Sequence, residues 1–184
     1  MTAHPMDIVG FWRSAGPRKW FAKDAGFDSM IALKFEQTHY RAAQRRYDKW
    51  AETPEGALAL LILLDQFPRN LYRGTAHAFA TDPLARMFAR AALAAGHDQA
   101  TEPQLRPFFY LPFEHSECLA DQEFCVELCA TLQADSGDED TIKWAVEHRD
   151  IIARFGRFPH RNAVLGRETT PEEQAFLDEG GFAG

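Results

Sequence analysis

The sequence has few of the residues that β-strands prefer. Its 184 residues include four valines, six isoleucines and ten threonines, against 28 alanines. Strands are enriched in β-branched residues and depleted in alanine, and no segment alternates apolar and polar residues for long. The composition therefore argues against a β-rich fold and predicts an all-α protein. Hydrophobic residues at 46% and charged residues at 26% are typical of a globular chain rather than a disordered one.

Long apolar segments and signal features are also lacking. The longest uninterrupted apolar run is Ala57–Leu64, far short of the ~20 residues that span a bilayer. The first residues show no basic start, apolar stretch or cleavage pattern of a signal peptide. The three cysteines are an odd number, which favours reduced thiols over a disulfide framework. We therefore expect a cytoplasmic protein without a membrane partner.

Excess positive charge and familiar catalytic motifs are missing. The formal net charge is −7, which argues against a nucleic-acid partner, since phosphate contacts need a basic surface. The motifs GxxxxGK, GxGxxG, GxSxG and HExxH do not occur. On one straight helix His115 and Cys129 would lie ~21 Å apart, so they could not share a zinc ion with Cys118 and Cys125. We expect no metal and no cofactor.

Helix start signals divide the chain into helices joined by short loops. Proline or a capping residue marks such a start at Pro5, Asp28, Thr53-Pro54, Asp82-Pro83 and Thr170-Pro171. The helix capped by Asp28 is expected to run to about residue 47. Further helices are predicted over about 112–133 and 141–155, with the acidic segment 135–140 as a loop. Short loops favour antiparallel helix pairs, and the lack of a linker predicts one domain over residues 1–184.

An arginine-rich stretch, RFGRFPHRNAVLGR, spans residues 154–167 and is called here the arginine corner. It holds four arginines and one histidine without an acid. Guanidinium forks match carboxylate and phosphate oxygens in pairs, so the corner could bind an anion. Alternatively, its arginines pair with protein acids, first Asp65, Glu117 and Asp150, and pin the loop to the helices. With a similar Phe-Pro segment at 67–68, the predicted ligand-binding residues are Arg69, Asn70, Arg154, Arg157, His160, Arg161 and Asn162.

The segment FEHSE at 113–117 could supply acid–base chemistry. Glu114 and Glu117 are i,i+3 neighbours beside His115, a residue that serves as a general base or metal ligand. The alternative is a plain helix start, because acids are favoured in the first turn. His115 and Glu117 are therefore candidate catalytic residues.

His148 is the third catalytic candidate. It lies on a stripe with Trp144, Ile151 and Phe155 at helical spacing, and we expect this stripe to be buried. A histidine in such a place is either a satisfied core residue or, near Glu114 or Glu117, a group with a shifted pKa.

Five motifs in order resemble a known family. They are WFAKDAGFD, LALLILLDQFPRNLYRGTAHAFATD, FFYLPFEHSE, HRDIIARFGRFPHRNAVLGR and TTPEEQAFL. Together they resemble the bacterial domain-of-unknown-function family nine-two-four, over residues from about 10 to 177. The resemblance implies an all-α domain similar to tetratricopeptide-repeat-like helical bundles. It implies no activity, because that family has none assigned.

Taken together, these patterns predict one polar pocket that binds a small anion, a carboxylate or phosphate metabolite. The pocket would combine the two Phe-Pro corners with the segments around His115 and His148, since polar groups converging in an apolar wall typify ligand sites. Whether such a protein is an enzyme stays open. The alternative is a non-catalytic helical module that binds a protein or peptide in a groove, and a third reading is a buried network that only holds the fold together.

Overall fold

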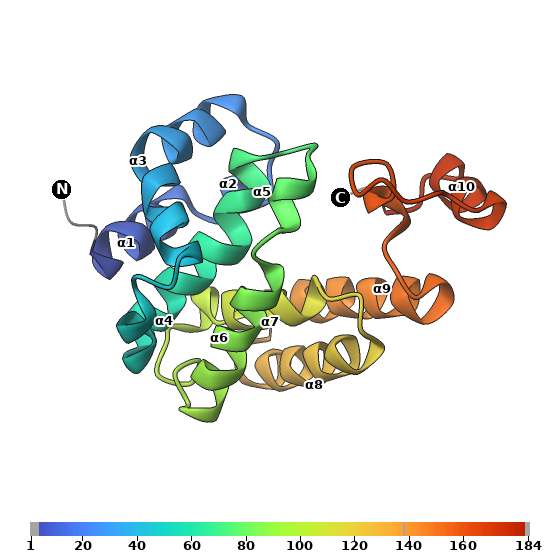
Figure 1. Ribbon diagram of the computed structural model, residues 1–184. Helices are drawn as coiled ribbons and strands as arrows, with labels where there is room; N and C mark the ends of the chain where they lie inside the picture. The colour runs from blue at the N-terminus through green and yellow to red at the C-terminus, as the bar shows by residue number, and fades with distance from the viewer. Residues whose placement is uncertain (1–3, 138, 183–184) are drawn as a thin grey trace. The chain divides into compact units, whose positions relative to one another are not determined.

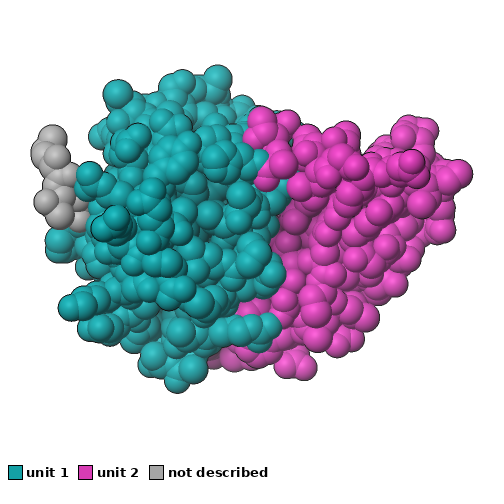
Figure 2. All heavy atoms as spheres, in the orientation of Figure 1, with its two compact units in different colours: residues 1–73, 77–112 teal, residues 74–76, 113–184 magenta. Residues whose placement is uncertain are grey.

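The structure, a computed structural model, describes residues 4–137 and 139–182. The chain falls into two compact units, each treated by itself below: unit 1 comprises residues 1–73 and 77–112, and unit 2 residues 74–76 and 113–184 (Figure 2). Within the described ranges the chain forms helices, turns and irregular segments and no β-strand. The all-α prediction is therefore confirmed. The repeat-like arrangement and the single domain over 1–184 stay predictions.

Helices follow one another closely through unit 1 (Figure 1). They are α1 (Pro5–Ala15), α2 (Pro17–Trp20), α3 (Ala25–Ala43), the 3₁₀ helix η1 (Asp48–Glu52), α4 (Pro54–Leu61), the π-helix η2 (Ile62–Gln66), α5 (Phe67–Leu71), the 3₁₀ helix η3 (Ala76–Phe79), α6 (Asp82–Ala94), the 3₁₀ helix η4 (Pro103–Leu105) and α7 (Pro107–Glu114). The last residues of α7 belong to unit 2, as does the first residue of η3.

Two long helices form the body of unit 2. They are α8 (Leu119–Ser136) and α9 (Glu139–Phe155), which pack against each other as a helical hairpin (Figure 1). The short 3₁₀ helix η5 (Pro159–Arg161) and the helix α10 (Pro171–Asp178) follow. The predicted loop at 135–140 is shorter than expected, because α8 extends to Ser136 and α9 begins at Glu139; residue 138 lies outside the described residues.

The capping signals of the sequence are largely confirmed. Thr53 caps α4, its Oγ1 accepting a hydrogen bond from the Gly56 amide, and Thr170 and Glu173 form a capping box at the start of α10. The prediction that Asp28 caps the long helix was wrong. Asp24 does so, with its Oδ1 accepting from the amide of Phe27 at 3.0 Å, and the helix ends at Ala43 rather than near 47. Asp24 and Asp28 lie four residues apart, and the sequence alone does not show which of them caps the helix.

The predicted continuous helix over 112–133 is also wrong, because the chain breaks between α7 and α8. Pro112 lies inside α7 rather than limiting it. Ser116 makes the break: its Oγ donates to Asp121 and accepts from the Cys118 amide. The Gln122 side chain donates to the carbonyls of Glu114 and Ser116, both at 2.6 Å. Side chains thus replace the helical partners that these backbone groups lose.

The apolar run Ala57–Leu64 is helical, but its last three residues and the following Asp65 and Gln66 are wound as the π-helix η2. A π-helix shifts the backbone hydrogen bonds by one residue and so leaves carbonyls in need of other donors. His39 contacts the Leu63 carbonyl at 2.8 Å, Thr81 donates to that of Leu64, and Arg69 donates to that of Asp65. Polar side chains from three elements therefore hold this irregular turn inside a core of aromatic and aliphatic residues.

Unit 2 has its own small core on one face of α9. Ile151, Ile152 and Phe158 are buried, and Phe155, Phe176 and Phe182 pack against them. His148 is buried at 6% exposure, as its stripe predicts. Trp144 and Phe155 were expected to be buried too, but Trp144 is 46% exposed and Phe155 is half-buried.

Candidate functional site

The arginine corner leaves α9 through a tight turn. Gly156 has φ +68, a left-handed conformation that favours glycine, and the turn lets the chain reverse before Phe158. Pro159 then begins the 3₁₀ helix η5, so that His160 and Arg161 follow each other on a short, rigid segment. The similar segment at 67–71 is α-helical instead, so the two Phe-Pro corners differ in backbone.

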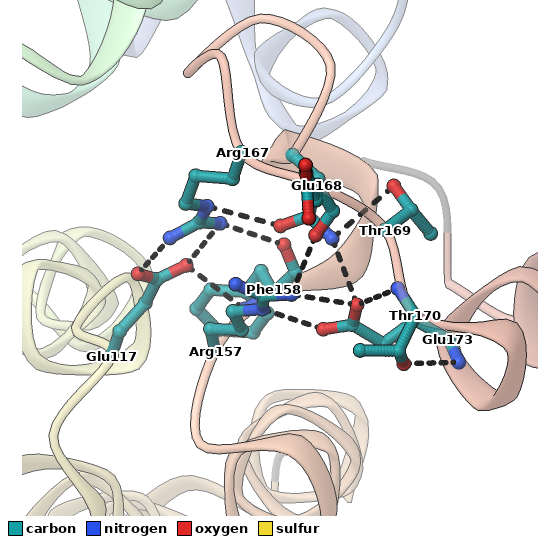
Figure 3. A network of polar contacts seen from close by, with 9 residues as sticks. Glu117, Arg157, Phe158, Arg167, Glu168, Thr169, Thr170 and Glu173 are labelled. Atoms are coloured by element: carbon teal, nitrogen blue, oxygen red, sulfur yellow. Dashed lines mark hydrogen bonds and ion pairs between the residues drawn. The ribbon is translucent and has the colours of Figure 1, made fainter.

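Glu173 is the centre of a polar network within unit 2 (Figure 3). Its carboxylate accepts two hydrogen bonds from the fork of Arg157, at 2.6 and 2.8 Å. The same carboxylate accepts from the Asn162 side chain and the Thr170 amide. The hydrogen bond from Arg157 lowers the pKa of Glu173 to about 2, although burial opposes it. Glu173 is only 2% exposed, so its carboxylate is shielded from solvent, whereas the side chain of Arg157 is 29% exposed.

Glu117 joins the other end of the same network (Figure 3). Arg167 donates to both oxygens of its carboxylate, at 2.6 and 3.0 Å, and the Phe158 amide donates to it at 2.9 Å. Asn162 connects the halves, because its Oδ1 accepts from Arg167 while its Nδ2 donates to Glu173. Burial alone would raise the pKa of Glu117, but these hydrogen bonds lower it below its ordinary value.

Most of the arginine corner is therefore committed to acids. Arg154 pairs with Glu172, Arg157 with Glu173 and Arg167 with Glu117. Of the three acids expected from the sequence to pair with these arginines, only Glu117 is seen to do so. Asp150 pairs with Arg149 instead, and Asp65 pairs with Arg69 in unit 1. The acids that sequence reasoning missed, Glu172 and Glu173, stand in a motif already recognised as a helix start. Their second role as arginine partners has no local signal.

Arg161 is buried, with 6% of its surface exposed. Its guanidinium lies over the ring of Phe158, 4.4 Å from the centroid, and its Nη1 donates to the His115 carbonyl. A guanidinium on an aromatic face keeps its charge in a poorly hydrated place. Arg161 thus brings a positive charge to the predicted histidine residues.

Two histidines and two phenylalanines of unit 2 form a cluster of four rings. His148 lies 5.6 Å from Phe158 and 4.5 Å from Phe182, and His160 lies 5.6 and 5.2 Å from the same two rings. Together with His115 and Arg161, these histidines make what we call the imidazole–guanidinium cluster.

His160 is the residue of this cluster with the most altered chemistry. Burial, together with the charges of Arg161, His148 and His115, lowers the pKa of His160 to about 3, while Glu117 opposes the shift. Its ring is therefore neutral at physiological pH. Its Nδ1 is buried without a hydrogen-bond partner. Buried polar nitrogens nearly always have a partner, so this atom needs an explanation.

His148 has a defined hydrogen-bond geometry. Its Nδ1 lies 2.9 Å from the Trp144 carbonyl, and because a carbonyl only accepts, Nδ1 carries the proton in the neutral ring. The same nitrogen lies 3.7 Å from the carboxylate of Glu114, which is also buried. Glu114 and Glu117 were expected on one helix face; instead Glu114 ends α7 and Glu117 lies in the break before α8.

We expect acid to weaken unit 2 through His160. In the unfolded chain the ring titrates near ~6.5, so between that pH and its folded value the unfolded state binds more protons. Acidification should then lower the free energy of unfolding by up to ~1.4 kcal/mol per pH unit. His160→Gln should flatten this slope between pH 7 and 5 in urea titrations. Equal slopes of unfolding free energy against pH in the two proteins would contradict the assignment of His160 as a buried, neutral ring. The pKa of His39 is also lowered, but His39 is present in both proteins and so does not contribute to the difference.

Arg69 and Asn70 lie in unit 1 and have their own partners. The fork of Arg69 donates to both oxygens of Asp82, at 2.9 and 3.0 Å. Asn70 donates to Asp28, which also binds Arg73. Unit 1 thus holds these two predicted ligand-binding residues in a network that joins α3, α5 and α6.

Two of the three cysteines have the character of core residues, whereas Cys118 is exposed. Cys125 and Cys129 are buried with sulfurs 3.9 Å apart, and the contact with Cys129 raises the pKa of Cys125 well above its usual value. A protonated thiol is a poor nucleophile. In the described ranges, no three His, Cys, Asp or Glu side chains are arranged to hold a metal ion. The described helices include none with the length and apolar character needed to cross a membrane.

Fold and site thus define an all-α protein with a buried polar network beside an imidazole–guanidinium cluster. The chain belongs to the family described as bacterial protein of unknown function (DUF924), whose model matches residues 8–181. A solved structure, that of the protein of unknown function ATU0120 from Agrobacterium tumefaciens, is similar to it at 55% sequence identity and a TM-score of 0.91. The match covers 96% of this chain and 97% of that one. A comparison with curated proteins found no match.

Proposed function

We propose that unit 2 binds a small anion, a carboxylate or phosphate, at the imidazole–guanidinium cluster. The observation that carries the proposal is the buried Nδ1 of His160, which has no hydrogen-bond partner. As a neutral ring with its proton on Nδ1, His160 can donate to a carboxylate or phosphate oxygen. The adjacent guanidinium of Arg161 would add a charge-assisted interaction with the same ligand.

The charges around His160 favour a negative ligand. Arg161, His148 and His115 all lower the pKa of His160, which means that the potential at its ring is made positive by three neighbours and reduced by Glu117. A bound anion would reverse part of this effect and raise the pKa of His160. By linkage, the anion should bind more tightly as the pH falls towards the pKa of the complex.

The remaining predicted residues receive supporting roles in this proposal. Arg157, Asn162 and Glu117 hold the segment that carries His160 and Arg161, and both oxygens of Glu117 already accept hydrogen bonds. Arg154 pairs with Glu172 at the surface. The proposed function is binding without catalysis. We place the protein in the cytoplasm, the reducing compartment typical of proteins with free thiols.

The alternative is a non-catalytic module that binds a peptide in a groove, and an open cleft lined by Phe155, Phe176 and Phe182 is the feature of unit 2 that favours it. This cleft has a volume of about 450 Å³. Small-molecule sites typically measure roughly 300–1,000 Å³, so the cleft has the size of such a site.

Ligand-induced stabilisation tests the proposal. Acetate and inorganic phosphate are added at constant ionic strength, and the free energy of unfolding is measured by urea titration. A ligand at 100 times its dissociation constant should stabilise the wild-type protein by about 2.7 kcal/mol. His160→Gln and Arg161→Lys should weaken binding at least about tenfold, because they remove the ring donor and the fork.

Arg154→Lys is the matched control, since Arg154 lies in the same corner but is exposed and paired with Glu172. It should bind the anion as the wild-type protein does. Equal stabilisation of wild type and His160→Gln by the same anion would overturn the proposal, as would the absence of any stabilisation at millimolar acetate or phosphate.

A further inference from the structure

An open cleft lies on the surface of unit 2 between α9 and the C-terminal segment. It has a volume of about 450 Å³. Its apolar lining includes Ile151, Phe155, Phe176 and Phe182, all from the small core of this unit. Phe155, Phe176 and Phe182 are only half-buried, so their rings offer apolar surface to a ligand.

The cleft depends on two glycines after α10. Gly180 has φ +83, which turns the chain back towards α9. At Gly181 an added Cβ would lie 2.5 Å from the Phe176 ring, so a side chain at this position would require that ring to move. The Gly-Gly pair therefore brings Phe182 onto α9 and completes the wall.

Phe182 belongs both to this wall and to the imidazole–guanidinium cluster. Its ring lines the cleft. The centre of the same ring lies 4.5 Å from that of His148 and 5.2 Å from that of His160. A ligand resting in the cleft therefore lies one ring away from the imidazoles. His148, His160 and Arg161 do not line the cleft themselves, and the Phe182 ring is the contact between the cleft and the two imidazoles.

We infer that the ligand is an amphipathic carboxylate, with its hydrocarbon part in the cleft and its carboxylate at His160 and Arg161. This inference rests on the proposed anion-binding function and adds the ligand class. The charge pattern fits it: Lys143 and Arg154 balance Glu147 and Asp150 along the cleft, so the lining has no formal net charge. The positive charge of Arg161 acts on His160, whose ring contacts Phe182.

A chain-length series tests the inference. Acetate, butanoate, hexanoate and octanoate are titrated into the full-length protein by calorimetry, at concentrations below those at which the chains aggregate. Each methylene buried in the cleft should tighten binding about fourfold. Octanol, which has the same chain length without the charge, should bind much more weakly than octanoate.

Two phenylalanine variants separate the cleft from general stability. Phe155→Ala removes a ring that lines the cleft and should abolish most of the gain from acetate to octanoate while leaving acetate binding unchanged. Phe124→Ala is the matched control, because Phe124 is a half-buried ring of α8 that packs on Phe113 and is not among the residues lining the cleft. It should keep the full dependence on chain length.

The outcomes distinguish this inference from the proposed function. If acetate binds as tightly as octanoate, and His160→Gln weakens both, the anion site stands and the amphipathic ligand is wrong. If octanol binds as tightly as octanoate and His160→Gln has no effect, the cleft binds apolar molecules and both the anion site and the inference are wrong. If no member of the series binds at millimolar concentration, both are wrong as well.

Discussion

Glu173→Gln is expected to lower the free energy of unfolding by about 3 kcal/mol. The residue is 2% exposed, and its oxygens accept from Arg157, Asn162 and the Thr170 amide. A glutamine amide nitrogen in place of one oxygen would meet donors rather than acceptors and would leave the charge of Arg157 uncompensated. Breaking a buried pair in this way costs about 3–5 kcal/mol, and the partial exposure of Arg157 places the expectation at the lower end. Urea unfolding measures the effect.

Glu172→Gln is the control, because Glu172 is the preceding residue and its side chain is 66% exposed. Its pair with Arg154 should contribute less than about 1 kcal/mol. If the two substitutions destabilise the protein equally, the network around Glu173 does not have the structural role assigned to it.

The same residue predicts a response to strong acid. The folded pKa of Glu173 is about 2, below the value of about 4.3 for an unfolded chain. Its stabilising effect is therefore complete above pH ~4.5 and is lost as the pH falls through the folded pKa. The glutamine variant should lack this part of the acid sensitivity.

Gly56→Ala is expected to destabilise unit 1 by about 3 kcal/mol or more. Gly56 lies in the first turn of α4, where an added Cβ would overlap the carbonyl group of Trp50. The obstacle is backbone and cannot rotate away, so α4 or η1 must shift. The better helix propensity of alanine returns only about 1 kcal/mol.

Gly10→Ala provides the matched comparison in the same unit. Gly10 lies inside α1, and an added Cβ there meets nothing within 4 Å. Alanine should stabilise this helix by about 0.5–1 kcal/mol. A Gly56→Ala protein as stable as the Gly10→Ala protein would show that the close approach of α4 to Trp50 is not a constraint.

The helix starts were predictable because their signals are local. Thr53 and Thr170 act on amides within three residues, so the sequence contains both partners. The break after α7 was not predictable in the same way, because it depends on Gln122 donating back to carbonyls six and eight residues earlier. The local sequence is compatible with a continuous helix, so the break is determined by these tertiary contacts.

The candidate site was predictable in its residue types and less so in its pairing. The absence of acids in the arginine corner correctly indicated that its arginines find partners elsewhere, and Glu117 was named among them. The partner Glu173 lies 16 residues from Arg157 and was found only from the folded chain. The role of Phe182, which contacts His148 and His160, has no sequence signal, since it depends on the turn at Gly180 and Gly181.

The most direct test of the account is the nitrogen chemical shift of the His160 ring, followed by NMR while octanoate, acetate or phosphate is added at pH 7. His160→Gln assigns the resonance. Hydrogen bonding to an anion should move the Nδ1 signal saturably, with the same dissociation constant that calorimetry gives, while the ring of His4, a residue of unit 1, stays unchanged. A His160 signal that does not move at ligand concentrations that saturate the calorimetric binding, or that already titrates near pH 6.5 without ligand, would contradict the proposed site.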